Sequence, residues 1–110
     1  MKIKAGEQEY DVEVADTFLS RAKGLSFRDE GKMFFRFSRP TNARIDMMFL
    51  SRPLYLYFFD SERKLIHSEK AEPWSFNPKT WRFYRPEKRY QYLLESFEDL
   101  GLEEGDRINF

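Results

Sequence analysis

Turn-forming residues divide this chain into short segments, and most of these segments alternate between polar and apolar side chains. Glu9–Val14 shows this period of two, and Lys32–Phe37 places Met33, Phe35 and Phe37 on one face. Successive side chains of a β-strand point to opposite faces of a sheet, so the alternation is typical of strands with one buried face. Segments this short leave little room for long helices. The sequence therefore predicts a mostly-β fold built from antiparallel sheets.

The middle of the chain predicts a core hairpin, with strands over residues 43–50 and 54–59. The second of these, Leu54–Phe59, is apolar on both faces, as expected for a strand inside a sheet. Pro40 and Asn42 are expected to end the strand before the hairpin. Further strands are predicted over residues 64–70, 80–84, 89–95 and 107–110, and short helices over residues 16–23, capped by Asp16 or Thr17, and 96–100, capped by Ser96. About eight short strands in all favour an all-β barrel or jelly-roll-like sandwich with one or two short helices.

A chain of 110 residues has the usual size of one domain, and we expect residues 1–110 to form a single one. Its 12 Phe, 6 Tyr and 2 Trp provide a rich core, because each aromatic ring can bury about 150 to 250 Å². The 19 Lys and Arg balance the 19 Asp and Glu. The molecule as a whole therefore has no net attraction for polyanions, and any nucleic-acid contact must depend on a local patch.

Missing residues and motifs exclude several classes of enzyme. The chain has no Cys, so it has no disulfide framework, no thiol nucleophile and no thiolate metal site. Phosphate-binding glycine loops, nucleophile elbows, metalloprotease motifs and dinucleotide-binding fingerprints are also absent. His67 is the only histidine, so a zinc site would have to use His67 and carboxylates, an uncommon set of ligands for that metal. We therefore predict no catalytic residue, no metal and no cofactor.

The apolar runs of the chain are short. The longest, Leu54–Phe59, is far below the roughly twenty residues of a membrane span, and the N-terminus lacks the apolar run of a signal peptide. The sequence thus predicts a cytoplasmic protein without a membrane partner. A content of 35% charged residues is also typical of heat-adapted proteins.

The chain carries an ordered series of positions, most of them glycine, apolar or turn-forming residues. Its members are Thr17, Arg21, Gly24-Leu25, Arg28, Gly31–Phe35, Met47, Pro53-Leu54, Phe58, Asp60, Pro73, Tyr92–Glu95 and Gly105-Asp106. In order and spacing this set resembles the signature of the DUF192 family of bacterial and archaeal proteins. The resemblance implies a compact, mainly β, jelly-roll-like fold. It implies no function, because the function of the family is not established.

The chain departs from the DUF192 pattern in one region. Where family members often carry a Lys-Asn-Thr run after the Met and an Asp after Pro-Leu, this chain has Met48-Phe49-Leu50 and Tyr55. Polar groups have thus been replaced by apolar ones. If those polar groups line a family site, this protein has lost or rebuilt it.

Four polar residues within or beside the signature are candidates for a ligand site: Arg21, Arg28, Asp46 and Glu95. We favour the interpretation that Arg and carboxylate form a hydrogen-bonded ion pair that fixes the packing. The alternative is an anion clamp, in which the two Arg side chains bind a ligand. Asp46 and Glu95 could also form the acid–base pair of a hydrolase, which requires a cleft and a specific separation.

The loop Pro73–Pro78 carries two large aromatic residues, Trp74 and Phe76. Exposed aromatic residues in loops often mark recognition sites. The alternative is that both rings fold back and cover one end of the barrel. Both interpretations remain open from the sequence.

Residues 79–90 combine five cations and four aromatic residues with one carboxylate. This mixture is found where proteins bind phosphates and stack unpaired bases, so it is the candidate nucleic-acid surface. Alternation favours a plainer interpretation, in which Trp81 and Phe83 are core residues and Arg82 faces solvent. The acidic stretch 95–106 would then neutralise the cations. The cations and the aromatic residue of the candidate surface are Lys79, Arg82, Arg85, Lys88, Arg89 and Trp81.

These observations favour a non-catalytic binding or interaction module for a small ligand or a protein partner. The ligand would contact the end of the barrel near Trp74, Phe76 and the arginines. The first alternative is single-stranded nucleic-acid binding through residues 79–90. The second is a hydrolase-type enzyme that uses acidic residues.

Overall fold

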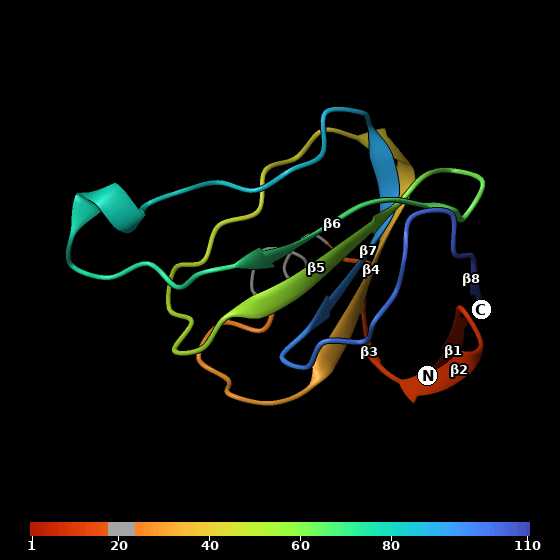
Figure 1. The fold of residues 1–110 in the computed structure, drawn as a ribbon, viewed down its shortest axis with the longest axis horizontal. Coiled ribbons are helices and arrows are strands. Elements are labelled where there is room, and N and C mark those ends of the chain that lie inside the picture. The colour runs from red at the N-terminus through yellow and green to blue at the C-terminus, as the bar shows by residue number, and fades with distance from the viewer. Residues whose placement is uncertain (18–23) are drawn as a thin grey trace.

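A five-stranded sheet forms the centre of the computed structural model, which describes residues 1–17 and 24–110 (Figure 1). Its strands lie in the order β3 (Glu13–Ala15), β4 (Lys32–Thr41), β7 (Tyr90–Ser96), β5 (Leu54–Phe59) and β6 (Leu65–Ala71). β3 and β4 are parallel, whereas the other neighbours are antiparallel. This order makes β4, β7 and β5 interior strands.

A second, three-stranded sheet packs beside the first one. Its order is β2 (Gln8–Asp11), β1 (Lys2–Ala5) and β8 (Ile108–Asn109), and Ile3 of β1 pairs with Tyr10 of β2. Ile3 and Ile108 are buried in one cluster with Phe34 of β4. The alternation along β4 sends Phe34 toward this sheet and its neighbours Met33 and Phe35 to the opposite face.

Loops cover the opposite face of the five-stranded sheet. Leu25, Met47, Leu50 and Tyr84 come from these loops and are buried in one cluster with Phe35 and other residues of the sheet. The protein is therefore mainly β, with two sheets and core residues on both faces of the larger one. The prediction of a β fold is confirmed, but the two described sheets do not join into a closed barrel.

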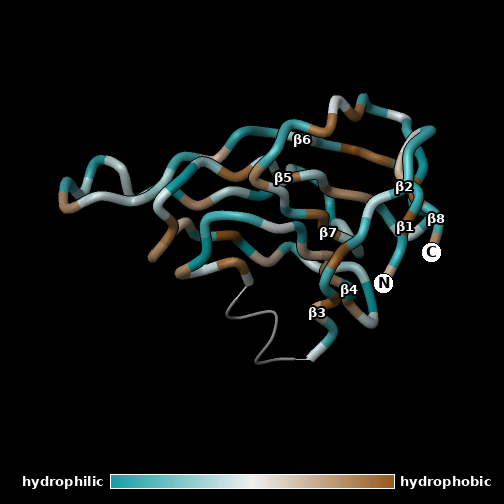
Figure 2. The backbone as a smooth tube through the Cα atoms, turned by 90° about the horizontal axis from the view of Figure 1, so that it is seen from below, coloured by the Kyte–Doolittle hydropathy of each residue, from teal (hydrophilic) through white to brown (hydrophobic). Residues whose placement is uncertain are grey.

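Residues 73–86 form an arm that projects from the sheets (Figures 1 and 2). Its tip holds the short 3₁₀ helix η1 (Pro78–Thr80), at the end of the molecule away from both termini. Side-chain oxygens of Asn77 and Thr80 accept backbone N–H groups of Lys79 and Ser75, at 3.0 and 2.8 Å, and so close the tip. We call residues 73–86 the aromatic arm.

The predicted core hairpin is wrong, although Leu54–Phe59 is an interior strand as predicted. β5 pairs with β6 and β7, so both of its edges are occupied. Residues 43–50 form only a single bridge, between Ile45 and Tyr84. The Asp46 carboxylate accepts the N–H of Met48 at 3.0 Å, and Phe49 has a left-handed φ of 64°. Both features fix turns that are incompatible with a continuous strand.

Three further boundaries differ from the predictions. Residues 80–84 do not form a strand, because the turn at η1 and the single bridge at Tyr84 take their backbone groups. Residues 96–100 do not form a helix, since Ser96 still pairs in β7 and its hydroxyl accepts only the N–H of Glu98. β4 continues through Pro40, where its pairing with β7 shifts register. The helix predicted over residues 16–23 lies largely outside the described residues.

Candidate functional site

Glu95 lies on the interior strand β7, between Met33 of β4 and Leu56 of β5. Its side chain shares a face with Leu93, the face that the loops cover. Only 4% of Glu95 is exposed, and Glu95 and Ser96 are the buried polar residues of the described chain. A carboxyl group is costly to bury without a partner, so this position needs an explanation.

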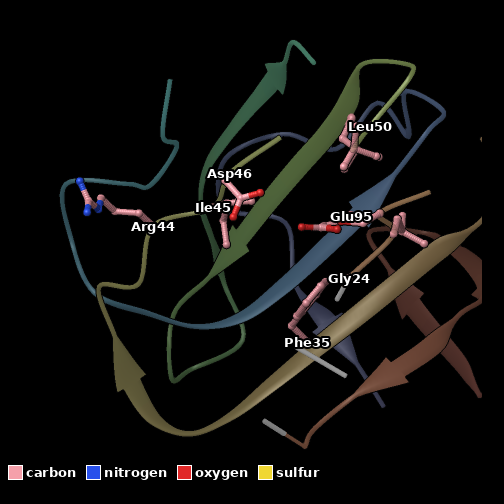
Figure 3. Close-up of a pocket in the computed structure, with 10 residues that line it drawn as sticks. Gly24, Phe35, Arg44, Ile45, Asp46, Leu50 and Glu95 are labelled. Atoms are coloured by element: carbon pink, nitrogen blue, oxygen red, sulfur yellow. The ribbon is translucent and has the colours of Figure 1, made fainter. Parts of the chain in front are cut away.

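The Glu95 carboxyl borders a cavity of about 140 Å³ between the sheet and the loops. Asp46, held by its hydrogen bond to Met48, lies on the loop side of the same cavity. Figure 3 shows both carboxyl groups directed toward the space between β7 and this loop. The structure thus brings together two of the four predicted polar candidates.

Gly24 permits this arrangement on the third side of the cavity. It has a left-handed φ of 52°, and a Cβ atom there would lie 3.3 Å from Phe35 and 3.4 Å from Glu95 Oε1. Such a position is favourable only for glycine. Gly24 belongs to the signature noted in the sequence, but nothing in the sequence connects it to Glu95.

The pKa of Glu95 is raised from 4.5 to about 8, mainly by burial and in addition by the nearby charge of Asp46. Within residues 1–17 and 24–110, no group forms a hydrogen bond with the Glu95 carboxyl. No described side-chain oxygen is both sealed from solvent and unpaired, so the Glu95 oxygens open onto the cavity. A neutral carboxyl therefore faces a second carboxyl across a space that a ligand group can enter.

Metal binding has less support at this position. The described residues contain no group of three or more His, Cys, Asp or Glu side chains placed to hold a metal ion. Two carboxyls alone provide fewer ligands than calcium or magnesium usually takes from protein and water. A positively charged organic group matches the two carboxyls more closely.

The arginine candidates lie elsewhere. Arg28 forms an ion pair with Glu13 of β3. Its carboxylate partner is therefore Glu13 and neither Asp46 nor Glu95. Arg21 lies outside the described residues. Arg44 borders the cavity, but its guanidinium lies 4.4 Å from the ring centre of Phe83 and points away from Glu95 (Figure 3).

An apolar groove of about 420 Å³ adjoins the cavity, and Leu50 lines both. Trp74 is partly buried, whereas Phe76 is 104% exposed, so the two rings differ in environment. In the sequence, Met48-Phe49-Leu50 are recognisable only as a departure from the family pattern, and their place in a groove could not be predicted from it. The groove is lined by Met48, Phe49, Leu50, Trp74, Ser75, Phe76 and Trp81.

The remaining candidates are also separate from the carboxyl cavity. His67 on β6 contacts Glu69 at 3.3 Å and is not among the residues that line the cavity. Trp81 and Phe83 are 52% and 48% exposed, so the interpretation of both as core residues is wrong. Lys79, Arg82, Arg85, Lys88 and Arg89 are all exposed.

Comparison with known proteins settles the family. The DUF192 model, described as an uncharacterized conserved group, matches residues 1–110. The chain belongs to the DUF192 family. Its curated relatives carry the family name UPF0127: the protein of Thermococcus kodakarensis is 33% identical over 107 residues, which cover 90% of this chain and 64% of the relative.

Other DUF192 relatives also come from thermophilic archaea. The UPF0127 protein of Thermococcus sibiricus is 31% identical, and the match covers 90% of this chain and 65% of the relative. The chain thus spans slightly less than two thirds of these two Thermococcus proteins. The UPF0127 protein of Pyrococcus abyssi is 29% identical, with 97% of this chain and 92% of the relative covered.

Two solved structures have the same fold as this DUF192 chain. A protein of unknown function from Novosphingobium aromaticivorans has a TM-score of 0.83 at 22% identity, covering 99% of this chain and 84% of its own. A Sinorhizobium meliloti protein described as a "putative transcription regulator" has a TM-score of 0.79 at 22% identity, covering 97% and 90%. At this level of identity the likeness shows the fold alone. No helix in the described part of the chain is long and apolar enough to cross a membrane.

Proposed function

We propose that this DUF192 protein is a non-catalytic binding module that holds the cationic group of a small ligand between Glu95 and Asp46. One observation carries this proposal: Glu95 is 4% exposed, has no hydrogen-bond partner among the described residues, and faces Asp46 in a cavity. A buried carboxyl needs a charged or hydrogen-bonding partner once it ionises, and an ammonium or guanidinium group would supply that partner.

The cavity fits a ligand group rather than a whole ligand. Its volume of about 140 Å³ is close to the roughly 150 Å³ of an engineered cavity that holds benzene. It is smaller than the roughly 300 to 1,000 Å³ of most small-molecule sites. The adjoining groove, reached past Leu50, would contact the apolar part of the same ligand.

Binding of a cation would be linked to the release of a proton. With a pKa of about 8, Glu95 is mostly protonated at pH 7, and a bound cation favours its ionised form. If the carboxyl ionises fully, each binding event releases about 0.9 proton at pH 7. A measured proton release would therefore distinguish cation binding at Glu95 from cation binding at the exposed Asp46 alone.

The test is calorimetric titration with alkylammonium and alkylguanidinium ions in two buffers of different ionisation enthalpy. We expect binding with proton release, which Glu95→Gln abolishes and Asp46→Asn weakens. Glu98→Gln, which changes an exposed carboxylate, is the matched control. Equal binding by the Asp46→Asn, Glu95→Gln double variant, or a preference for carboxylate ligands of the same shape, would overturn the proposal.

Hydrolysis is the second candidate, because enzymes that use paired carboxyls often keep one protonated as the general acid. Glu95 would take that role and Asp46 would be the base. Release of nitrophenol from a panel of chromogenic glycosides and esters, lost in both single variants, would establish this candidate in place of simple binding.

A further inference from the structure

The aromatic arm carries a local positive charge on a molecule without net charge. Residues 73–86 contain Lys79, Arg82 and Arg85 and no Asp or Glu. The neighbouring segment, residues 38–45, adds Arg39 and Arg44 and also lacks Asp and Glu. A polyanion therefore meets cations here without acidic residues between them in either segment.

Backbone hydrogen bonds hold these two segments together. The Ile45 N–H donates to the Tyr84 carbonyl at 2.8 Å, and the Tyr84 N–H donates to the Ile45 carbonyl at 2.9 Å. Arg85 donates from its guanidinium to the carbonyl of Asn42 at 3.2 Å. Figure 1 shows the two segments side by side between the sheets and the tip.

Among the described residues, the acidic stretch 95–106 forms no ion pair with these cations. The ion pairs found among the described residues join Arg28 to Glu13, Lys32 to Glu98, Arg36 to Asp16 and His67 to Glu69. None of them includes a cation of the aromatic arm. Within the acidic stretch, Asp99 accepts from Tyr57 and Gly101, and Asp106 accepts from Glu103. The charge of the arm thus remains available to a partner.

The arm also holds aromatic rings in fixed, partly exposed positions. Trp74 stacks on Trp81 with 6.0 Å between ring centres and meets Phe83 edge-on at 5.3 Å. The indole N–H groups of Trp74 and Trp81 donate to the carbonyls of Arg82 and Ser75, both at 2.8 Å. Phe76 is fully exposed.

We propose that the aromatic arm and Arg44 form a contact surface for single-stranded nucleic acid, which borders the carboxyl cavity at Arg44 and shares Phe76 and Trp81 with the adjoining groove. Lys79, Arg82, Arg85 and Arg44 would bind phosphates, while the exposed faces of Phe76 and Trp81 stack on bases. Cations interspersed with aromatic faces are the recurring design of single-strand sites. Single strands fit this surface better than two other polyanions. The bases of a duplex stack on one another instead of on protein rings, and an acidic peptide has no bases to stack on the aromatic faces.

The first test is fluorescence anisotropy of a labelled twelve-nucleotide oligo(dT) and of its RNA counterpart. Four phosphate contacts give a salt slope of about −2.8, so affinity should fall about 50-fold between 50 and 200 mM salt. Lys79→Gln with Arg82→Gln should halve the slope, leaving a fall of about 7-fold. Lys2→Gln with Lys4→Gln removes two exposed cations at the opposite end of the molecule and should change neither value.

The second test separates stacking from charge. Phe76→Leu keeps an apolar side chain but removes the ring, and should weaken binding between about 5-fold and about 150-fold; Phe76→Tyr should retain it. Phe76 is fully exposed, so these variants leave the fold intact. No binding at 50 mM salt, equal affinity for the duplex or for polyglutamate, or an unchanged affinity of Phe76→Leu would each overturn the proposal.

Discussion

Replacing Glu95 by Gln removes one titratable proton from the core of the protein while keeping the shape of the side chain. The pKa of Glu95 rises from 4.5 to about 8 on folding, first because of burial and then because of Asp46. The folded-state pKa lies above the unfolded value, so the stability that this group contributes is fully present below pH 4.5. It is lost as the pH rises to about 8, because folding then opposes ionisation.

The size of this loss follows from the two pKa values. Each unit of difference corresponds to about 1.4 kcal/mol, so titration of Glu95 lowers the free energy of unfolding by about 4 kcal/mol between pH 5 and pH 9. More than half of the loss falls below pH 7. A change of this size is a large part of the roughly 5 to 15 kcal/mol that stabilises an ordinary domain.

Urea unfolding followed by tryptophan fluorescence at pH 5, 7 and 9 measures the effect. We expect the wild type and Glu95→Gln to be similar at pH 5, and the variant to be more stable by about 4 kcal/mol at pH 9. Glu98→Gln changes an exposed carboxylate and should follow the wild type at every pH. The reasoning is refuted if Glu95→Gln shows the same pH dependence as the wild type.

Two other substitutions test the packing around the site. Gly24→Ala should cost about 1 to 2 kcal/mol, because alanine resists the left-handed φ of 52° and its Cβ would lie 3.3 Å from Phe35. Thermal unfolding measures this, and an unchanged midpoint would contradict the close approach. Tyr57→Phe should cost about 1 to 3 kcal/mol, since the Tyr57 hydroxyl accepts the Leu100 N–H at 2.8 Å and donates to Asp99 at 3.2 Å. An equal loss in Tyr55→Phe, which changes a tyrosine on the same strand, would show that these two bonds are not the cause.

The β-strands could be predicted where alternation and pairing agree. Lys32–Phe37 and Leu54–Phe59 both form strands where their patterns predict them. The one-sided pattern of Lys32–Phe37 is misleading, however, because Phe34 is buried on the face opposite Met33 and Phe35. Residues 43–50 have a similar pattern, but they form a loop that buries Met47 and Leu50 and leaves Met48 and Phe49 exposed. Residues 43–50 cannot pair with β5 because β6 and β7 occupy both of its edges. The alternation within one segment does not indicate which strands lie beside it.

The carboxyl site could be predicted only in part. The sequence indicates Asp46 and Glu95 as candidates, but their proximity depends on β7 lying inside the sheet and on the loop that the Asp46 side chain stabilises. The exposed state of Trp81 and Phe83 follows from the arm leaving the sheet, which the composition of residues 79–90 does not reveal. Cations and aromatic rings occur together both on strands and on projecting loops.

Leu50 connects the departure from the family pattern with the protonated state of Glu95. It occupies the last position of the apolar run that replaces Lys-Asn-Thr, is 8% exposed, and lines the cavity beside Glu95. Leu50→Thr would place a hydroxyl at this wall, and a hydrogen bond to the ionised carboxyl should lower the pKa of Glu95 by about one to two units. The loss of stability between pH 5 and pH 9 should shrink accordingly.

Leu50→Val is the matched control for Leu50→Thr, since valine has the shape of threonine without the hydroxyl. Both variants lose the same packing volume, so their stabilities at pH 5 should fall together by a similar amount. Only the threonine variant should show a weaker pH dependence in urea unfolding. Equal pH dependence in the two variants would mean that Leu50 does not control the environment of Glu95, and that its burial by the sheet alone keeps the carboxyl protonated.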